Sequence, residues 1–194
     1  MDMPNPSLVN TVAGLNRFVN LPVKLTKRLS LEELFAIVLN ESVELTNCDG
    51  ATLYMPEGDS LTFQHMITRS KKWELTRSTG ASELKPVPME KKFVCAYAAM
   101  SGKPINIMDV YEAREYDFAG TYQYDQMNSY RTKSMLVAPM MTEESGLCGV
   151  IQLINAMDED GNIVPFVTKH VQIMMAIGAL AALKMDDMKL RGEL

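Results

Sequence analysis

The sequence predicts an α+β fold, in which helices cover both faces of a central antiparallel sheet. Residues 134–141 and 147–155 are apolar runs joined by a Glu-Glu-Ser-Gly turn, an arrangement typical of an antiparallel hairpin. The second run is too continuously apolar to leave one strand face in water, so both of its sides should be covered. Helical and extended segments follow one another irregularly, which argues against a doubly wound parallel sheet.

The N-terminal quarter is expected to be mainly helical. Residues 1–7 contain two prolines and little apolar content, which predicts a loose tail. Residues 8–29 read as a helical arm, interrupted near Pro22 because a proline nitrogen has no hydrogen to donate. A capping-box sequence at Ser30 begins the next helix, which carries one apolar stripe and ends at the turn signal of residues 47–50.

The rest of the chain mixes strands and helices. Strands are expected at residues 51–56 and 60–68, where β-branched and aromatic residues are frequent. The following segment is basic and irregular. The other expected elements are a helix at 90–100, a short strand at 103–107, a polar Tyr-rich segment at 109–130 and a long helix at 166–190.

Composition indicates one globular domain. The chain has 194 residues, of which 47% are hydrophobic and 22% charged. Its net charge of −5 provides no general attraction to nucleic acid or anionic membranes. No apolar run is long enough for a membrane span, and no secretory signal pattern begins the chain. Cys48, Cys95 and Cys148 are odd in number and widely spaced, which fits a reducing compartment, so we expect a cytoplasmic location.

Two features invite other functions. Residues 67–92 hold seven Lys or Arg against three Glu, with Trp73 among them, but one basic loop on an acidic protein is a poor nucleic-acid footprint. A solvated loop, or one that helps to hold an anionic ligand, fits better. His65 and His170 are the two histidines, too few for a His-based metal site or catalytic triad. We therefore expect no catalytic residue and no metal.

Three stretches resemble GAF domains, the small-molecule sensor modules of signalling proteins. They are residues 102–109 (GKPINIMD), 129–140 (SYRTKSMLVAPM) and 149–155 (GVIQLIN). Together they are similar to the C-terminal half of GAF domains of cyclic-nucleotide phosphodiesterases. The resemblance implies a PAS-related fold with a six-stranded antiparallel sheet, helices on both faces and a ligand cavity at one face. It divides the chain into a tail and arm (1–29), a GAF core (30–165) and a C-terminal helix (166–194).

In GAF domains the segment that corresponds to residues 109–132 forms a lid over the ligand. Here it has five aromatic residues within fifteen positions, enough to stack on a planar base, unless they serve only to pack the connection. By positional match, the start of the helix near residue 94 also faces the ligand, although a free Cys is more often a small buried hydrophobe. The expected ligand-binding residues are Val94, Cys95, Phe118, Thr121, Tyr122, Asn128, Tyr130, Thr132 and Ser134.

One departure concerns the ligand. Cyclic-nucleotide-binding relatives carry Asn-Lys after the last strand, then a Phe and, further on, Asp-Glu. Asn155 and Phe166 match this pattern, but Ala156 replaces the Lys, and His170 and Val171 replace the Asp and Glu. The Lys–Asp ion pair that the resemblance implies cannot form. This argues against cyclic AMP or cyclic GMP and leaves the ligand unidentified.

The C-terminal helix carries a coiled-coil spacing. Apolar and small residues recur at intervals of three and four, namely Val171, Met174, Gly178, Ala181, Met185 and Met188. This predicts a homodimer through the terminal helices, with packing against the chain's own domain as the alternative. In GAF-containing proteins such a helix leads to an output domain, expected here beyond this chain. The lid sequence is most similar to GAF domains that precede bacterial HD-GYP phosphodiesterases and nucleotide cyclases.

The sequence thus predicts a non-enzymatic regulatory domain, in which a small molecule under the 109–132 lid biases helix packing in a dimer. The alternative is a ligand-free GAF domain that serves dimerisation, which lid aromatics in mutual contact would favour. A remote alternative is reduction of free methionine sulfoxide, the activity of a small GAF subfamily, which needs two thiols close together.

Overall fold

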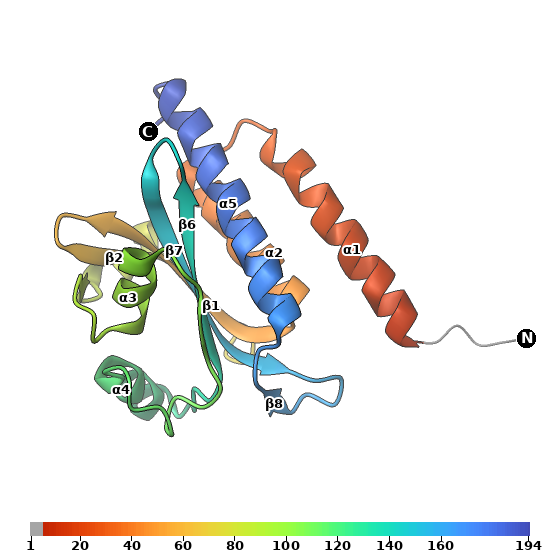
Figure 1. The fold of residues 1–194 in the computed structure, drawn as a ribbon, viewed down its shortest axis with the longest axis vertical. Helices are drawn as coiled ribbons and strands as arrows, with labels where there is room; N and C mark the ends of the chain where they lie inside the picture. The colour runs from red at the N-terminus through yellow and green to blue at the C-terminus, as the bar shows by residue number, and fades with distance from the viewer. Residues whose placement is uncertain (1–5) are drawn as a thin grey trace, which may run out of the picture.

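The computed structural model describes residues 6–194, with side chains from Val12 onward (Figure 1). Most of the tail expected over residues 1–7 lies outside the described residues, and Pro6 begins the first helix. The elements in chain order are α1 (Pro6–Leu25), α2 (Leu31–Thr46), β1 (Cys48–Glu57), β2 (Ser60–Thr68), β3 (Trp73–Thr76), the 3-10 turns η1 (Arg77–Thr79) and η2 (Ala81–Glu83), β4 (Val87–Pro88), α3 (Val94–Ser101), β5 (Ile105–Ile107), α4 (Ala119–Asn128), β6 (Met135–Thr142), β7 (Gly146–Met157), β8 (Ile163–Val164) and α5 (Thr168–Leu190).

The sheet has a main path of six antiparallel strands in the order β3-β2-β1-β7-β6-β5. The short strands β4 and β8 pair with β2 and β7. The β6–β7 hairpin, with Leu136 opposite Leu153, is the one that the two apolar runs predict. Gly149 lets β7 approach β1 closely, because a Cβ there would lie 2.7 Å from the Tyr54 carbonyl oxygen. The predicted α+β fold is confirmed.

One face of the sheet is covered by long helices, with α2 and α5 nearest the strands and α1 on the outside (Figure 1). The capping box of α2 forms as predicted: Ser30 Oγ accepts from the Glu33 N–H at 3.2 Å, and Glu33 Oε2 accepts from the Ser30 N–H at 2.7 Å. α5 lies on β6, where a Cβ on Gly178 would be 3.0 Å from the Pro139 carbonyl oxygen. The absence of a side chain at this glycine therefore lets helix and strand approach closely.

The periodic residues of α5 face this sheet. Met174, Gly178, Ala181, Met185 and Met188 are all buried within the single chain. The prediction that they form a dimer seam is therefore wrong, because the helix covers its own domain over most of its length rather than over its first half. Intervals of three and four identify the buried face of a helix, but not what buries it.

α1 runs unbroken through Pro22, so the expected interruption is absent. Pro22 lies on the exposed side, where water can reach the carbonyl that the proline leaves without a donor. Leu21 and Leu25 are buried on the opposite side and pack in the core of α2 and α5. Tertiary packing on both sides of the proline thus keeps the helix continuous.

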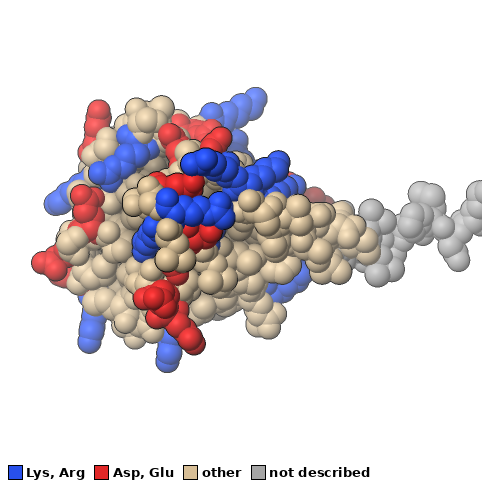
Figure 2. All heavy atoms as spheres, turned by 90° about the horizontal axis from the view of Figure 1, so that it is seen from above, with Lys and Arg blue, Asp and Glu red and all other residues tan. Residues whose placement is uncertain are grey.

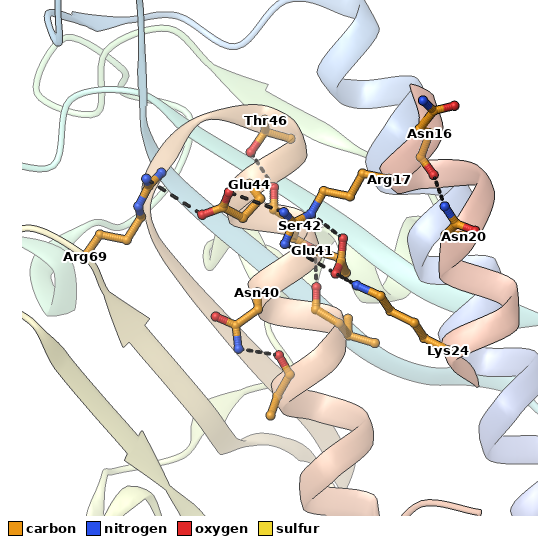
Figure 3. Close-up of polar contacts among 12 residues, drawn as sticks. Asn16, Arg17, Asn20, Lys24, Asn40, Glu41, Ser42, Glu44, Thr46 and Arg69 are labelled. Carbon is orange, nitrogen blue, oxygen red and sulfur yellow. Dashed lines mark hydrogen bonds and ion pairs between the residues drawn. The ribbon is translucent and has the colours of Figure 1, made fainter. Parts of the chain in front are cut away.

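A buried carboxylate fastens α1 to α2 (Figure 3). Glu41 of α2 is 3% exposed, and Arg17 Nε and Lys24 Nζ donate to its two oxygens at 2.6 and 2.5 Å. Arg17 also lies 3.5 Å from Glu44, which is 3.8 Å from Arg69 in the β2–β3 connection. Arg17 and Lys24 are the charged residues of α1, so both of its charges are directed at the domain.

The other face of the sheet is covered by shorter elements. α3 packs on β6 and β7, and α4 lies beyond one end of the strands (Figure 1). The basic segment that was expected to be irregular contains β3, the 3-10 turns and β4, and the polar Tyr-rich segment contains α4. A second apolar cluster fills the space between α3 and the sheet. Within residues 6–194, no helix has the length and apolar character to cross a membrane.

Candidate functional site

The sheet face beneath α3 is apolar except at its centre. Strand alternation directs Tyr54 and Thr52 of β1 to this face, opposite Val150 and Gln152 of β7. Gln152 is also opposite Val137 of β6. The Thr52 hydroxyl, the Tyr54 phenol and the Gln152 amide are thus polar groups set among apolar side chains, at the middle of the sheet.

Cys95 of α3 completes this polar centre. Its thiol donates to Gln152 Oε1 at 2.8 Å, and the Tyr54 hydroxyl lies beside Cys95 and Thr52. Burial raises the pKa of Cys95 to about 12 and holds the pKa of Tyr54 well above its usual value. Both groups are therefore protonated near pH 7, and the centre offers neutral hydrogen-bonding groups.

Gln152 is only partly buried although β7 is a central strand. On the helix side of β7, Ile151 and Leu153 are fully buried, whereas Gln152 and Ile154 on the α3 side are only partly buried. The cover over this face is therefore incomplete near the middle of the sheet. Ligand pockets are mostly apolar and contain a few polar groups that orient the ligand, as this face does.

A buried carboxylate holds α4 in place. Asp125 of α4 accepts hydrogen bonds from the Thr132 N–H and Oγ1, both at 2.8 Å, and from the Tyr111 hydroxyl at 2.9 Å. Tyr122 of the same helix donates to the Val110 carbonyl at 3.2 Å. Because Tyr111 precedes α4 and Thr132 follows it, one carboxylate joins the two ends of the segment that carries the helix.

A second carboxylate ties the end of this segment to β1. Asp49 accepts from the Tyr130 hydroxyl at 2.6 Å and from the N–H and Oγ of Ser70 at 2.9 and 2.7 Å. Burial and the neighbouring Asp49 raise the pKa of Tyr130, which therefore remains a donor. Asn155, at the end of β7 with φ of 57°, adds three hydrogen bonds to residues 130–133.

The aromatic residues of the segment contact one another. Ring centroids lie 4.8 to 6.4 Å apart in the pairs Tyr111–Tyr122, Tyr116–Phe118, Phe118–Tyr122 and Tyr124–Tyr130. Trp73 of β3 extends this contact, with its ring 6.3 Å from that of Tyr124. In this conformation the aromatics therefore pack together.

The predicted ligand-binding residues fall into three groups. Those buried in the apolar cluster beneath α3 are Val94, Cys95 and Phe118. Those hydrogen-bonded within the chain are Tyr130, Thr132 and Ser134. Those on α4 that are partly or largely exposed are Thr121, Tyr122 and Asn128. Their role in binding a ligand stays a prediction.

Sequence reasoning missed five polar residues of this region: Asp49, Thr52, Tyr54, Asp125 and Gln152. Gln152 had a readable signal, because it is the amide within an otherwise apolar run from Gly149 to Ile154. Thr52 is an ordinary strand residue by sequence, and Asp125 sits in a polar stretch. For these two, the tertiary contacts alone reveal the role.

The three thiols do not meet. Cys95 lies in the cluster beneath α3, whereas Cys48 and Cys148 belong to the core on the helix side of the sheet. Cys48 is opposite Ala156, eight residues along β7 from Cys148, which corresponds to roughly 26 Å in an extended strand. Thiol–disulfide exchange needs sulfurs in contact, so this arrangement does not favour methionine sulfoxide reduction.

The positions at which this chain differs from cyclic-nucleotide-binding relatives lie outside the polar centre beneath α3. Ala156 is fully buried in the core on the helix side. His170 is in the first turn of α5, where its ring packs on Phe166 with centroids 5.8 Å apart. The ion pair implied by the resemblance therefore has no counterpart at these positions.

Two surface hollows lie away from Gln152. One of about 220 Å³ lies between α2 and β3, beside Arg69 and Trp73. The other, of about 350 Å³, lies at the outer edge of β2, beside Thr62 and Arg77. None of the predicted ligand-binding residues lines either hollow.

An antiparallel sheet with long helices on one face, and with a short helix and a connecting segment on the other, defines an α+β domain. The GAF domain family model matches residues 30–185. The chain belongs to the GAF family.

Known proteins agree with this assignment. The chain is 32% identical over 65 residues to the dual 3′,5′-cyclic-AMP and -GMP phosphodiesterase 11 of Drosophila melanogaster, a match that covers 34% of this chain and 4% of that protein. Its fold is similar to the GAF domain of a phosphoenolpyruvate-protein phosphotransferase from Coxiella burnetii, with a TM-score of 0.71, 12% identity and coverage of 93% and 97% of the two chains.

A third similarity concerns an enzyme. The free methionine-R-sulfoxide reductase from Neisseria meningitidis, solved with its substrate, has a TM-score of 0.64 and 10% identity, with coverage of 98% and 96%. At this identity the likeness shows the fold alone. GAF domains are commonly regulatory parts of signalling proteins, and the matched phosphodiesterase is far longer than this chain.

Proposed function

We propose that this GAF domain is a regulatory sensor, which binds a small molecule on the sheet face beneath α3 and α4 and controls a dimeric output. The observation that carries the proposal is Gln152, a polar side chain at the centre of an apolar sheet face that is only partly buried. A central-strand position on a covered face is otherwise occupied by an apolar residue, as Ile151 and Leu153 illustrate on the other side.

The chemistry of the face favours a neutral, partly planar ligand. Thr52, Tyr54, Cys95 and Gln152 are all uncharged near pH 7, so they suit a carbonyl, amide or ring nitrogen better than a phosphate. A side-chain amide both donates and accepts, and can therefore read a matching pair of groups on a heterocycle. A cyclic nucleotide would lack a cation at this centre to pair with its phosphate.

Regulation would act through the segment of α4. It is held by hydrogen bonds to Asp125 and Asp49 and by aromatic contacts, which a ligand can exchange for contacts with itself. Asn155 connects the same segment to the end of β7, and α5 follows soon after. A ligand that binds the two arrangements of the segment unequally shifts the equilibrium between them.

The test is a thermal-shift screen of the purified chain with nucleobases, nucleosides, amino acids, cyclic nucleotides and free methionine sulfoxide. A ligand at a hundred times its dissociation constant adds about 2.7 kcal/mol of stability. We expect a neutral heterocycle to raise the unfolding temperature, and Gln152→Ala to abolish the shift. Gln64→Ala, at a partly buried glutamine of β2, is the matched control and should keep it.

The second candidate is a ligand-free module that serves dimerisation, and the mutual contacts of the lid aromatics favour it. It predicts no shift with any compound, together with a folded and self-associated chain. A shift that survives Gln152→Ala would place the ligand elsewhere and overturn the site proposed above.

A further inference from the structure

The hollow between α2 and β3 has an apolar floor. Its volume is about 220 Å³, and the end of β2 contributes to its lining. Val43 of α2 and Ile67 of β2 line it and are buried, while Trp73 at the start of β3 is partly buried. Sites for drug-sized ligands have volumes of about 300–1,000 Å³, so this hollow suits a smaller molecule.

The rim of the hollow carries as many positive groups as negative ones. Arg69 and Lys72 are its cations, Glu44 and Glu74 are its anions, and all four residues are exposed. Over the face of the molecule that Figure 2 displays, Lys and Arg are likewise mixed with Asp and Glu. Local charges, rather than a wide field of one sign, therefore decide which ligands the surface attracts. A molecule with one charge of each sign matches this rim.

Two of the rim groups lie side by side without a hydrogen bond between them. Arg69 Nη2 is 3.8 Å from Glu44 Oε1, which is too far for a hydrogen bond (Figure 3). The other contacts of these groups are also long: Glu44 is 3.5 Å from Arg17, and Arg69 Nη1 is 3.5 Å from the Cys48 carbonyl oxygen. A guanidinium has five N–H donors and a carboxylate about four acceptor positions, so both groups can bind a ligand as well.

Two further hydrogen-bond acceptors border the hollow. Asn40 of α2 donates its amide N–H to the Ala36 carbonyl at 2.8 Å, which leaves its side-chain oxygen available. Glu74 Oε1 lies 2.7 Å from Nε2 of the buried His65, a contact that holds the carboxylate in place. Its second oxygen remains for another donor. With Glu44, these groups form a set of acceptors suited to an ammonium group.

Lys72 adds a cation at an unfavourable backbone position. Its φ is 50°, in the left-handed region that favours glycine. Its N–H donates to the Arg69 carbonyl at 3.0 Å and closes the turn between β2 and β3. A glycine would relax this turn, so the lysine contributes its charge rather than stability. Residues held in sparsely populated conformations cluster at ligand sites.

We infer that this hollow binds a free α-amino acid with an apolar side chain. The α-carboxylate contacts Arg69 and Lys72, the ammonium group contacts Glu44, and the side chain lies on Val43 and Ile67. A guanidinium binds a carboxylate through two parallel hydrogen bonds. A phosphate or dicarboxylate would bring a second negative charge to the carboxylates of the rim, and a diamine would bring a second positive charge to its cations.

This site goes beyond the proposed function and does not depend on it. Val43 and Ile67 belong to the core on the helix side of the sheet, whereas the proposed sensor site lies beneath α3 on the other side. A ligand at Glu44 would compete with Arg17 of α1, which is 3.5 Å from that carboxylate. Occupancy of the hollow therefore affects one of the contacts between α1 and α2.

Tryptophan fluorescence of the full chain tests the site, because Trp73 is the sole tryptophan of the sequence and lines the hollow. The probes are L-valine, L-leucine and L-methionine. We expect a saturable change in fluorescence with at least one of them. The N-acetyl derivative of that amino acid lacks the ammonium group and its amide lacks the carboxylate, so neither should bind over the same concentrations. No change with any of the three, or equal binding of either derivative, would overturn the inference.

Variants of the rim test the contacts. Arg69→Gln should weaken binding about tenfold or more, because the carboxylate loses its charge-assisted hydrogen bonds. Lys72→Gly removes a cation where glycine suits the backbone, and it should also weaken binding. Lys71→Gly is the matched control: Lys71 is exposed and does not line the hollow, so binding should change by less than about twofold. Equal effects of Lys72→Gly and Lys71→Gly would contradict the assignment.

The same titration with Gln152→Ala separates the two sites. We expect this variant to keep the fluorescence change, because Gln152 does not line the hollow. Binding that is lost in Gln152→Ala and kept in Arg69→Gln would place the amino acid beneath α3, which would overturn the hollow and support the sensor proposal. Binding in the hollow, together with no ligand that depends on Gln152, would support this inference while the sensor proposal fails.

Discussion

The two faces of the sheet are built on different principles. On the face of α1, α2 and α5, long helices bury aliphatic side chains, among them Leu34, Val38 and Leu153, all fully buried. On the other face, the short helix α3 packs on a second apolar cluster, and the segment of α4 is held by hydrogen bonds to Asp49 and Asp125 and by aromatic contacts. The first arrangement suits a rigid support and the second a segment that can open locally, because regions with few buried apolar contacts have low local stability.

The largest expected effect is on the helix face. Leu153→Ala should lower the free energy of unfolding by about 4 kcal/mol, because a fully buried leucine on a central strand leaves a cavity that the packed helices cannot close. Urea unfolding followed by far-UV circular dichroism measures it. Tyr122→Ala on the other face should cost clearly less, because that side chain is 38% exposed and leaves little cavity, and equal costs would contradict the distinction between the faces.

The loss of stability on breaking the Glu41 contact should depend on whether the cations or the carboxylate is removed. Replacing Arg17 and Lys24 together by Met leaves Glu41 buried without a cation, which should cost about 3 kcal/mol. Glu41→Gln instead leaves two cations whose side chains are 37% and 44% exposed and can be hydrated. It should cost less than half as much in the same urea experiment. A larger cost for Glu41→Gln would mean that the carboxylate has a partner beyond α1.

On the opposite face, Asp125→Asn should act locally. The amide cannot accept all three hydrogen bonds that the carboxylate accepts, and a hydrogen bond to a charged group contributes about 2 kcal/mol. Hydrogen exchange of residues 119–132 should therefore accelerate at least tenfold, with little change in exchange of β7. Uniform acceleration over the whole chain would show that the α4 segment does not open independently.

The smallest effect is expected at the capping box. Ser30→Ala should lower stability by about 1 kcal/mol, because the Glu33 N–H loses its acceptor. The hydrogen bonds from Ser30 lower the pKa of Glu33, so their contribution is present near neutral pH and is lost as the pH falls through the lowered pKa. The difference between Ser30→Ala and wild type in thermal unfolding should therefore shrink in acid. Ser82→Ala, at an exposed serine of η2, is a suitable control.

The success of the sequence-based predictions also differs between elements specified by local patterns and elements held by contacts distant in the sequence. The β6–β7 hairpin and the start of α2 are specified locally, by continuous apolar runs and by Ser30 with Glu33, and both predictions are confirmed. α4 was not expected as a helix, because its sequence has no apolar stripe and contains Gly120. Its helix depends on Asp125 bonding to residues outside it, a contact that no local pattern encodes.

The spacing on α5 gave a correct face and a wrong partner. Apolar residues at intervals of three and four are expected on a helix that packs against a sheet as well as on one that packs against a second helix. The close approach of Gly178 to Pro139 of β6 shows that α5 packs against the sheet. α1, in contrast, lies in a segment that was expected to be a helical arm interrupted near Pro22. The centre of the candidate site was missed for a related reason, since Gln152 becomes informative only when its neighbours across the sheet are known.

The contact at Glu41 changes where the folding unit should be cut. The family match begins at residue 30, after α1. A protein truncated there would keep Glu41 but lose both of its cations, and it would expose the surface that Leu21 and Leu25 cover. We expect such a fragment to be poorly soluble and prone to aggregation. The smallest independently stable piece of this chain therefore includes α1, although the residues that define the family do not.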